Sequence, residues 1–275
     1  MINNVAIIIP TLNRCEITLK CINQIIETKI NAQIIICDSG STDDTIKEIN
    51  KINNIDLISV GSNNWWSGAV NYGIKEALNR NFSKIIIMND DIHFEKNIFT
   101  NLLTLSNKNI YSIISPSQID KIGKYFGINY LGPFKKPFRI SEVNSIDVLK
   151  VDVTNGCFLI IPRIVFEKIG YFDEINCPHL GGDTEFLLRA KNNNFNTLVS
   201  TNDTITQFAY TNYKLKVKLS KILFGKGSPN NIKSHYKIGI QLYKTNLKLI
   251  FYGIFYNINY LKSLLRSLFI IYKII

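Results

Sequence analysis

Short apolar runs and amphipathic stretches follow one another regularly along the first third of the chain. The apolar runs are rich in β-branched residues and predict buried strands over residues 5–10, 33–37, 55–60 and 84–88. Between these runs, apolar residues recur at helical spacing and predict helices over residues 16–26, 44–52 and 67–79. This βαβαβαβ succession predicts an α/β fold with a parallel, doubly wound sheet of the nucleotide-binding kind.

The pattern changes beyond residue 110, where strand-like segments no longer alternate with long helices. Strands are predicted over residues 111–116, 150–154, 158–161 and 197–200, with turns that contain glycine or proline between them. One short helix is predicted over residues 183–192. We therefore expect a mixed second half beside a mostly parallel first half.

Composition limits the classes of protein to which the chain can belong. Apolar residues make up 46% of the 275 positions and charged residues 19%, so the chain can bury a core and is not disordered. No apolar run approaches the length of about 18 residues that a membrane-spanning helix needs, and no secretory signal opens the sequence. The five cysteines show neither C-x-x-C nor zinc-site spacing, so we expect reduced thiols in the cytosol.

Positive charge is concentrated at the C-terminal end of the sequence. Residues 1–203 hold 20 Lys and Arg against 21 Asp and Glu, a net charge of −1, whereas residues 204–275 hold 12 Lys and Arg and no acidic residue, a net charge of +12. From Ile258 onward, apolar residues fall on one helical stripe and basic residues on the other side. This pattern predicts a helix that lies in an anionic membrane surface, and a C-terminal helix packed on the sheet is the alternative. Nucleic-acid binding is not expected, because residues 1–203 are not basic and contain no recognised nucleic-acid module.

Polar clusters stand where the predicted parallel strands end. These clusters are Thr11–Arg14, Asp38–Asp44, Asn63–Gly68 and Asn89–Asp91. Because open α/β sheets bind their ligands at the carboxyl ends of the strands, we expect a binding site along this edge of the sheet.

Two of these clusters have both a structural and a functional interpretation. Residues 38–44 fit the capping of a helix N-terminus, or Asp38 accepts hydrogen bonds from a nucleobase or a ribose. Asn89–Asp91 fits a solvated turn, or its adjacent carboxylates bind a divalent cation together with a diphosphate. The second interpretation has a chemical reason, since Mg²⁺ prefers carboxylate and phosphate oxygen.

Two further motifs also have both a structural and a functional interpretation. Asp183 and Glu185 follow Gly181–Gly182 at the start of a predicted helix, where acidic residues stabilise the helix dipole. Alternatively, Asp183 is a general base. Trp65 and Trp66 either stack on a sugar or a base, or pack in the core.

Taken together, these segments resemble glycosyltransferase family 2, the inverting nucleotide-sugar transferases of the GT-A fold. The resemblance covers residues 4–210 and is carried by six segments in the family's order, residues 8–14, 38–43, 66–73, 89–91, 155–160 and 179–189. The chain is similar in particular to the branch that adds rhamnose or related sugars to bacterial surface polysaccharides. The expected fold is therefore GT-A, with a mixed acceptor-side half and a helical C-terminal extension.

The resemblance implies which residues bind the nucleotide-diphosphate sugar donor. Thr11 and Arg14 would line the nucleotide pocket, and Asp38 would bind the base. Asn71 and the backbone at Gly68 would lie near the nucleotide.

The resemblance also implies the residues that carry the reaction. Asp90 would contact the ribose, and Asp91 would hold a divalent cation, Mg²⁺ or Mn²⁺. Asp183 would deprotonate the acceptor hydroxyl as the catalytic base. His235 is a candidate third metal ligand, and a surface histidine without such a role is the alternative.

These roles imply transfer of a sugar to a polyprenyl-linked glycan in bacterial surface polysaccharide synthesis, such as that of O-antigen or capsule. We expect a GT-A catalytic domain over residues 1–210 and a membrane-associating extension over residues 211–275. The enzyme would then be cytoplasmic and peripheral on the inner face of the cell membrane. Transfer to a protein or soluble acceptor, and a non-catalytic nucleotide-binding membrane scaffold, are the alternatives.

Overall fold

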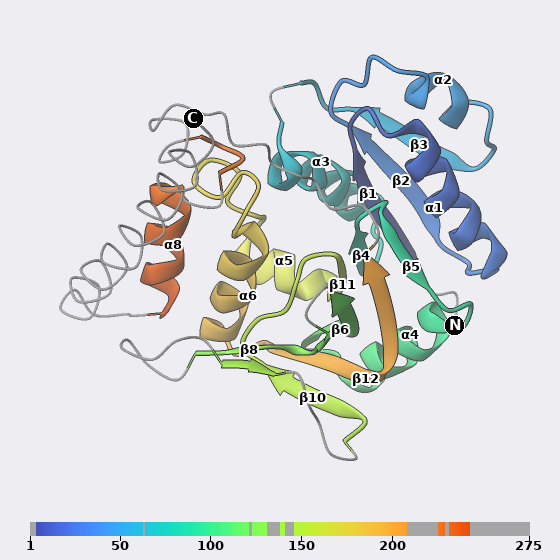
Figure 1. Cartoon of the computed structure of the whole chain (residues 1–275). Coiled ribbons are helices and arrows are strands. Elements are labelled where there is room, and N and C mark those ends of the chain that lie inside the picture. The colour runs from blue at the N-terminus through green and yellow to red at the C-terminus, as the bar shows by residue number, and fades with distance from the viewer. Residues whose placement is uncertain are drawn as a thin grey trace, which may run out of the picture.

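A large sheet of strands covered by helices on both faces forms the body of the protein (Figure 1). The computed structural model describes residues 4–62, 64–120, 123–130, 138–140, 146–207, 225–228 and 231–242. The main path of the sheet has the strand order β10-β12-β6-β11-β4-β1-β2-β3.

The N-terminal half of the sheet is the parallel unit that the sequence predicts. Its strands are β1 (Val5–Thr11), β2 (Gln33–Asp38), β3 (Ile55–Ser59) and β4 (Lys84–Met88), joined by helices α1 (Cys15–Glu27), α2 (Thr45–Ile49) and α3 (Trp66–Asn79). β1 pairs in parallel with β2 and β4, and β2 pairs in parallel with β3, which confirms the prediction. Helix α2 is shorter than predicted, because tight turns follow Ile49 and Asn54 takes a positive φ of 62° before β3.

The second half of the sheet is mixed, as predicted, and its strands do not follow chain order. β11 (Phe158–Pro162) lies between β4 and β6 (Ser112–Asp120) and is antiparallel to both. β12 (Asn196–Gln207) runs parallel to β6 and antiparallel to β10 (Val148–Val151). The shorter strands are β5 (Ile92–Phe94), β7 (Gly123–Tyr125), β8 (Gly127–Asn129) and β9 (Phe138–Ile140). β5 pairs with the end of β12, so the chain just after β4 meets the end of β12.

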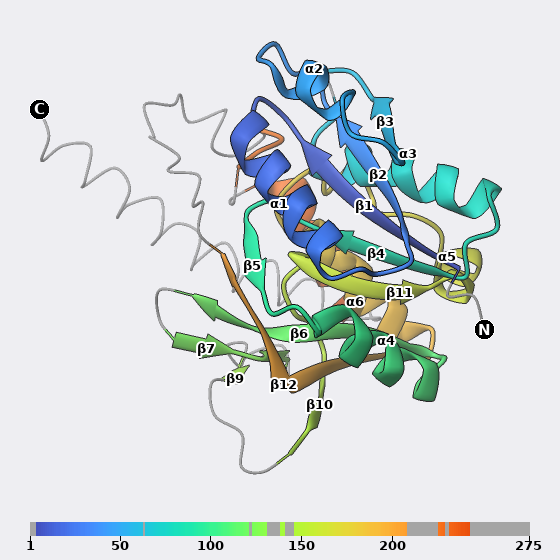
Figure 2. The same ribbon diagram turned by 90° about the vertical axis from the view of Figure 1, so that its right-hand side faces the viewer.

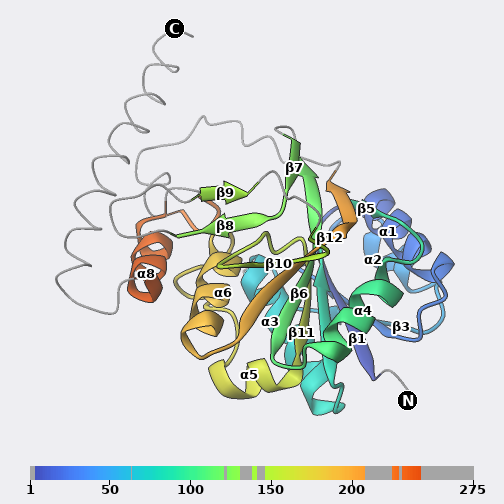
Figure 3. The same cartoon turned by 90° about the horizontal axis from the view of Figure 1, so that it is seen from below.

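Helices cover both faces of the sheet. Helices α1 and α4 (Ile98–Lys108) cover one face (Figure 2), and α3, α5 (Arg163–Ile169) and α6 (Gly182–Asn192) cover the other (Figure 3). The short helix expected over residues 183–192 is confirmed as α6. Helix α4 buries Ile98, Phe99 and Leu102 at helical spacing, a signal that the sequence carries but the expectations above did not use.

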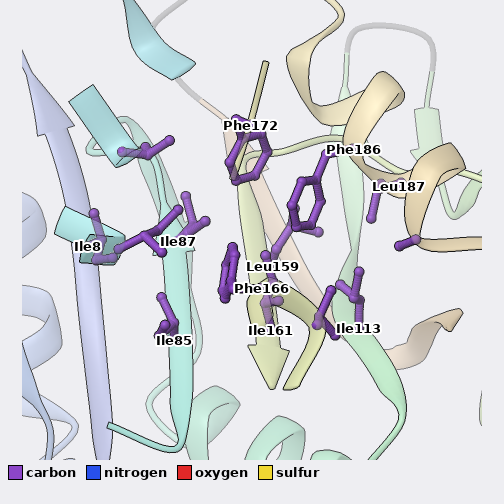
Figure 4. Packing of buried hydrophobic residues seen from close by; sticks show 14 of the residues in the cluster. Ile8, Ile85, Ile87, Ile113, Leu159, Ile161, Phe166, Phe172, Phe186 and Leu187 are labelled. Carbon is purple, nitrogen blue, oxygen red and sulfur yellow. The ribbon is translucent and has the colours of Figure 1, made fainter. Parts of the chain in front are cut away.

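Alternation along the strands divides the core into two layers. Ile7 and Ile9 of β1 face α1 and α4, whereas Ile8 faces α3, α5 and α6. The second layer includes Phe172 and Phe186, whose rings stack with centroids 4.3 Å apart (Figure 4). This packing fixes the segment that leads into α6 against the sheet.

Helix α8 (Ile232–Leu242) belongs to the expected C-terminal extension and packs beside α6 (Figure 1). Its Gln241 donates to Glu185 Oε1 over 3.0 Å, and its Ile238 joins the core layer of α3, α5 and α6. The predicted amphipathic helix after Ile258 lies outside the described residues. The domain boundary at residue 210 stays a prediction. Of the helices within the described ranges, none is long and apolar enough to cross a membrane.

Candidate active site

The N-D-D segment Asn89–Asp91 follows β4 at the carboxyl edge of the sheet. Asp90 and Asp91 are 1% and 3% exposed, so the segment is not a solvated turn. Arg14, at the start of α1, contacts both carboxylates: its Nη1 lies 3.0 Å from Asp90 Oδ1 and its Nη2 lies 3.1 Å from Asp91 Oδ2. One guanidinium faces two carboxylates, which leaves negative charge for a further cation.

Hydroxyl groups complete the surroundings of Asp90. Thr18 of α1 donates to Asp90 Oδ2 over 2.9 Å, and Thr11 lies 3.4 Å from the same oxygen. Burial raises the pKa of Asp90 to about 6, against the opposing effects of Arg14 and the threonine hydroxyls. The structure thus brings Thr11, Arg14 and Asp90 together, while their contacts with a nucleotide stay a prediction, and Thr18 is a member of this group that the sequence analysis missed.

Asp38 ends β2, which is separated from β4 by β1, and its side chain is fully buried. Its Oδ2 accepts from the backbone N–H groups of Gly40 and Ser41, over 2.9 and 3.0 Å. The same loop is joined to the loop after β1, since Asn13 N–H donates to Ser41 Oγ and Asn13 Oδ1 accepts from Thr42 N–H. Asp38 therefore orders the loop beside the site, and its contact with a base stays a prediction.

Asp183 lies at the start of α6, after Gly181 in the left-handed region with φ of 84°. Its Oδ2 accepts from Gly156 N–H over 2.8 Å, and its Oδ1 accepts from Thr184 N–H over 2.7 Å. Burial raises the pKa of Asp183, while these hydrogen bonds lower it. Oδ1 also accepts from the Thr184 hydroxyl over 3.4 Å, whereas Oδ2 accepts from Gly156 N–H and can still take a proton, so the geometry suits a general base.

The neighbouring acid in the same helix has a different environment. Glu185 is buried and forms an ion pair with Arg189, with 2.9 Å between Oε2 and Nη2. Arg189 also donates to the backbone oxygen of Tyr171. Glu185 therefore holds the turn before α6 in place, whereas Asp183 turns to the site.

Cys157 connects the N-D-D segment to Asp183. Its backbone oxygen accepts from Asn89 N–H over 3.0 Å, and its Sγ lies 3.5 Å from Asn89 Nδ2. Burial, together with the negative charges of Asp91 and Asp183, raises the pKa of the Cys157 thiol to about 12. Both carboxylates thus lie within electrostatic reach of one side chain. The sequence analysis had no signal for this role of Cys157.

The two tryptophans take different places. Trp66 donates its indole N–H to Asn89 Oδ1 over 2.9 Å and packs edge-on against Phe172. Trp65 is 40% exposed, and its ring centroid lies 5.5 Å from that of His179. Trp66 is therefore a packing residue inside the site, and Trp65 remains accessible.

Gly68 and Asn71 lie in the first turns of α3, both buried. Asn71 Nδ2 donates to the backbone oxygen of Phe172 over 3.0 Å, and Phe172 N–H donates to Asn71 Oδ1 over 3.1 Å. This pair fixes the segment before α6 to α3. The expected nearness of Gly68 and Asn71 to a nucleotide stays a prediction.

A divalent cation at Asp91 is compatible with the residues present. Within the part of the chain that the structure describes, no three His, Cys, Asp or Glu side chains form a metal-binding group, so His235 does not complete one with Asp90 and Asp91. His235 is half-buried on α8, and its role as a ligand stays a prediction. Mg²⁺ is commonly held by one or two carboxylates plus substrate phosphates, and the N-D-D segment can supply them.

Gly156 offers a test of the geometry around Asp183. A Cβ at position 156 would lie 2.9 Å from Asp183 Cβ and 3.3 Å from Asp183 Oδ2 and from the Trp66 ring. We expect Gly156→Ala to displace the carboxylate and to lower turnover about 10²-fold, because small misplacements of reacting groups are costly. Turnover and the melting temperature are measured together. Normal turnover in a folded variant would contradict the placement of Asp183.

The amino-acid sequence matches the family model described as glycosyl transferase family 2 over residues 6–170. One relative is the low-salt glycan biosynthesis hexosyltransferase Agl10 of Haloferax volcanii, 26% identical over 174 residues, which are 60% of this chain and 55% of that protein. Another is an uncharacterised glycosyltransferase of Rickettsia typhi, 29% identical over 174 residues, which are 62% of this chain and 54% of the relative. The chain thus spans about half the length of these curated relatives.

Solved structures share the fold at low sequence identity. GalNAc-T7, solved with UDP, GalNAc and Mn²⁺, superposes with a TM-score of 0.66 and 13% identity, over 86% of this chain and 47% of that chain. Residues 1–349 of S. aureus TarS, solved with UDP-GlcNAc, give a TM-score of 0.60 and 14% identity, over 92% of this chain and 70% of that chain. The fold is therefore GT-A, and the match of the family model shows that the chain belongs to glycosyl transferase family 2.

Proposed function

We propose that the protein transfers a sugar from a nucleotide-diphosphate sugar to an acceptor hydroxyl, with inversion and with Mg²⁺ or Mn²⁺. One observation carries the proposal: Asp183 accepts from the backbone next to Cys157, whose own backbone and thiol contact Asn89 of the N-D-D segment. A candidate base and a candidate metal carboxylate therefore share one site. The relatives named as glycosyltransferases, and the fold neighbours solved with UDP, UDP-GlcNAc or Mn²⁺, support it.

The donor would lie along the carboxyl edge of β1, β2 and β4. Asp38, Thr11 and Arg14 would surround the nucleotide, and Asp90 would contact the ribose. Asp91 would hold the cation, which supplies neutralisation of the leaving diphosphate when bound. Arg14 already faces both acids, so a rearrangement of its guanidinium toward the diphosphate accompanies donor binding in this proposal.

Asp183 would act on the acceptor. Its carboxylate takes the proton of the acceptor hydroxyl while that oxygen forms a bond to the anomeric carbon. The bond from this carbon to the diphosphate oxygen breaks, and the electron pair leaves with the diphosphate. Attack opposite to the leaving group inverts the anomeric centre, by the same geometry as in inverting hydrolases.

A lipid-linked glycan is the acceptor that we favour. The printed name of the Haloferax relative, a hexosyltransferase of glycan biosynthesis, agrees with a glycan product. The basic C-terminal sequence suits an acceptor anchored at an anionic membrane by a polyprenyl group. Bacterial surface polysaccharide synthesis on the cytoplasmic face is the corresponding setting.

The donor is identified by thermal shift. UDP-, TDP- and GDP-sugars are screened with and without Mn²⁺, because a ligand that binds the folded state raises the apparent melting temperature. The donor that responds is then tested for hydrolysis and for transfer to a polyprenyl-linked and to a soluble acceptor. Binding without either reaction would favour the non-catalytic scaffold, and equal use of both acceptors would favour a soluble substrate.

Removal of the chain after Thr245 tests the membrane part of the proposal. This truncation keeps α8, which ends at Leu242 and packs on α6, so the described fold is preserved. We expect sedimentation with phosphatidylglycerol vesicles to be lost, together with activity on the lipid-linked acceptor, while donor hydrolysis is kept. Four removed cations (Lys248, Lys262, Arg266 and Lys273) contribute at most about 1 kcal/mol each near an anionic surface.

Salt separates the two contributions to this binding. The electrostatic part weakens at high ionic strength, while burial of the apolar stripe persists. A full-length variant with Lys262, Arg266 and Lys273 changed to glutamine is the control and should lose only the salt-dependent part. Equal sedimentation of the full-length and truncated proteins would show that the tail does not bind membranes.

A further inference from the structure

The last residue of β12, Gln207, lies beside the acidic segment. In the sheet register Gln207 pairs with Ile92, the residue that follows Asp91. Its Nε2 lies 3.2 Å from both Oδ1 and Oδ2 of Asp91. The pairing of β5 with β12 therefore fixes an amide donor against the carboxylate that is the candidate metal ligand.

The orientation of this amide is determined by its other contacts. Gln207 Oε1 accepts from Gln118 Nε2 over 3.4 Å and lies 3.8 Å from Cys157 Sγ. Gln118 Oε1 in turn accepts from Asn155 Nδ2 over 2.6 Å. Since the oxygen of Gln207 is occupied by donors, its N–H₂ group must face Asp91. Because Gln118 is buried in β6, the position of this row of hydrogen-bonded amides is fixed by the sheet.

The same row of amides extends to the residues around Asp183, the candidate catalytic base. Asn155 precedes Gly156, whose N–H donates to Asp183 Oδ2. The hydrogen-bonded amides of Gln207, Gln118 and Asn155 thus connect the N-D-D segment to the turn before β11, whose Gly156 contacts Asp183. None of these three residues was expected to have a role from the sequence.

We propose that Gln207 is a positioning residue that orients the Asp91 carboxylate for a divalent cation, with its own amide held by Gln118 and Asn155. The proposal rests on the proposed function in assuming that Asp91 binds the cation. Arg14, before α1, supplies one donor to Asp91 in the absence of a nucleotide, and Gln207, at the end of β12, supplies a second. Partners of this kind hold a metal-binding side chain in one orientation before the metal arrives, and their loss typically costs 10- to 100-fold in metal affinity.

Replacement of Gln207 by leucine removes the donor at nearly constant volume. We expect the dissociation constant of Mn²⁺, measured by electron paramagnetic resonance in the presence of UDP and, separately, GDP, to rise about tenfold or more. Gln118→Leu leaves Gln207 in place but frees its orientation, so the same constant should rise by a smaller factor. If Gln207→Leu does not fold, Gln118→Leu alone still tests the proposal, and an unchanged constant in that variant would overturn it.

Gln241 provides a matched control. Gln241 lies on α8, and its Nε2 donates to Glu185 Oε1 of α6 over 3.0 Å. This is the same kind of bond as that of Gln207, but Glu185 is paired with Arg189 and is not a candidate metal ligand. Gln241→Leu should lower the melting temperature by as much as Gln207→Leu does and leave Mn²⁺ affinity unchanged. An equal loss of Mn²⁺ affinity in both variants would assign the effect to stability and overturn the proposal.

The wild-type protein separates two kinds of failure. If it binds no Mn²⁺ with either nucleotide, the metal-dependent function fails and the positioning role fails with it. If it binds Mn²⁺ and Gln207→Leu binds equally well, only the positioning role is wrong. If Gln207→Leu needs at least tenfold more Mn²⁺ while its fold is intact, Gln207 positions Asp91.

Discussion

Replacement of Asp183 by asparagine should lower sugar transfer by 10²- to 10⁴-fold while leaving donor affinity nearly unchanged. Asparagine keeps the size of the side chain and can still accept from Gly156 N–H, but it cannot take a proton from the acceptor. A base acts on the acceptor, so its loss appears in turnover and not in binding of the donor. Turnover and calorimetric donor affinity are the measurements.

The pH dependence of turnover gives the same residue a second signature. Burial raises the pKa of Asp183 above that of an exposed aspartate, so the base loses its ionised form at a higher pH than usual as the solution is acidified. The wild-type rate should therefore fall toward low pH, and the residual rate of Asp183→Asn should lack this limb. The control is Asp56→Asn, which should behave like wild type. Asp56 lies on β3 and forms a half-exposed ion pair with Arg80. Turnover above a tenth of wild type in Asp183→Asn would rule out the assignment.

Replacement of Asp91 by alanine should abolish the enhancement of donor binding by Mn²⁺. Without this carboxylate the diphosphate meets Asp90 with no cation held between them, so affinity in the presence of Mn²⁺ should fall at least about tenfold, or about 1.4 kcal/mol. Calorimetry of UDP and GDP binding, with and without Mn²⁺, measures the effect. Because Arg14 and Gln207 both contact Asp91, the melting temperature of the variant is recorded as well.

Two outcomes of this experiment are decisive. Loss of the Mn²⁺ effect with nucleotide binding retained in its absence supports Asp91 as the metal ligand. An undiminished Mn²⁺ effect would show that the cation is held elsewhere, and His235 would then be the next residue to replace. Asp56→Ala, which removes an acid at a distant strand, should leave the Mn²⁺ effect as it is in wild type.

The parallel half of the fold could be predicted because its signals are local. Each of β1, β2 and β4 contains an uninterrupted apolar run, since a parallel strand between helices is buried on both faces. Strands adjacent in the chain are joined by single helices, so their parallel direction follows from the βαβ alternation. The positions of Thr11, Asp38 and Asn89–Asp91 at the strand ends followed directly from these boundaries.

The mixed half depends on pairings that no local pattern encodes. β11 enters the sheet between β4 and β6, although the 69 residues from 89 to 157 separate the end of β4 at Met88 from the start of β11 at Phe158. The register of Phe158 with Met88 is set by packing on both faces of the sheet. β5 and β7 have three residues each and are strands only because a partner strand lies beside them. Helix α4 is the exception, since its spacing was visible and not used.

The sequence by itself determined the chemistry available at the site, because carboxylates, a guanidinium and the Gly-Gly-Asp turn stand at predicted element ends. Only the tertiary structure decided which groups meet. It buried Trp66 and left Trp65 accessible, and it placed Arg14 against both aspartates. It also brought Gln207 to Asp91, 116 positions earlier in the chain. Such contacts arise from strand order and side-chain packing over long sequence separations. The local sequence around a glutamine does not predict which distant group its amide will contact.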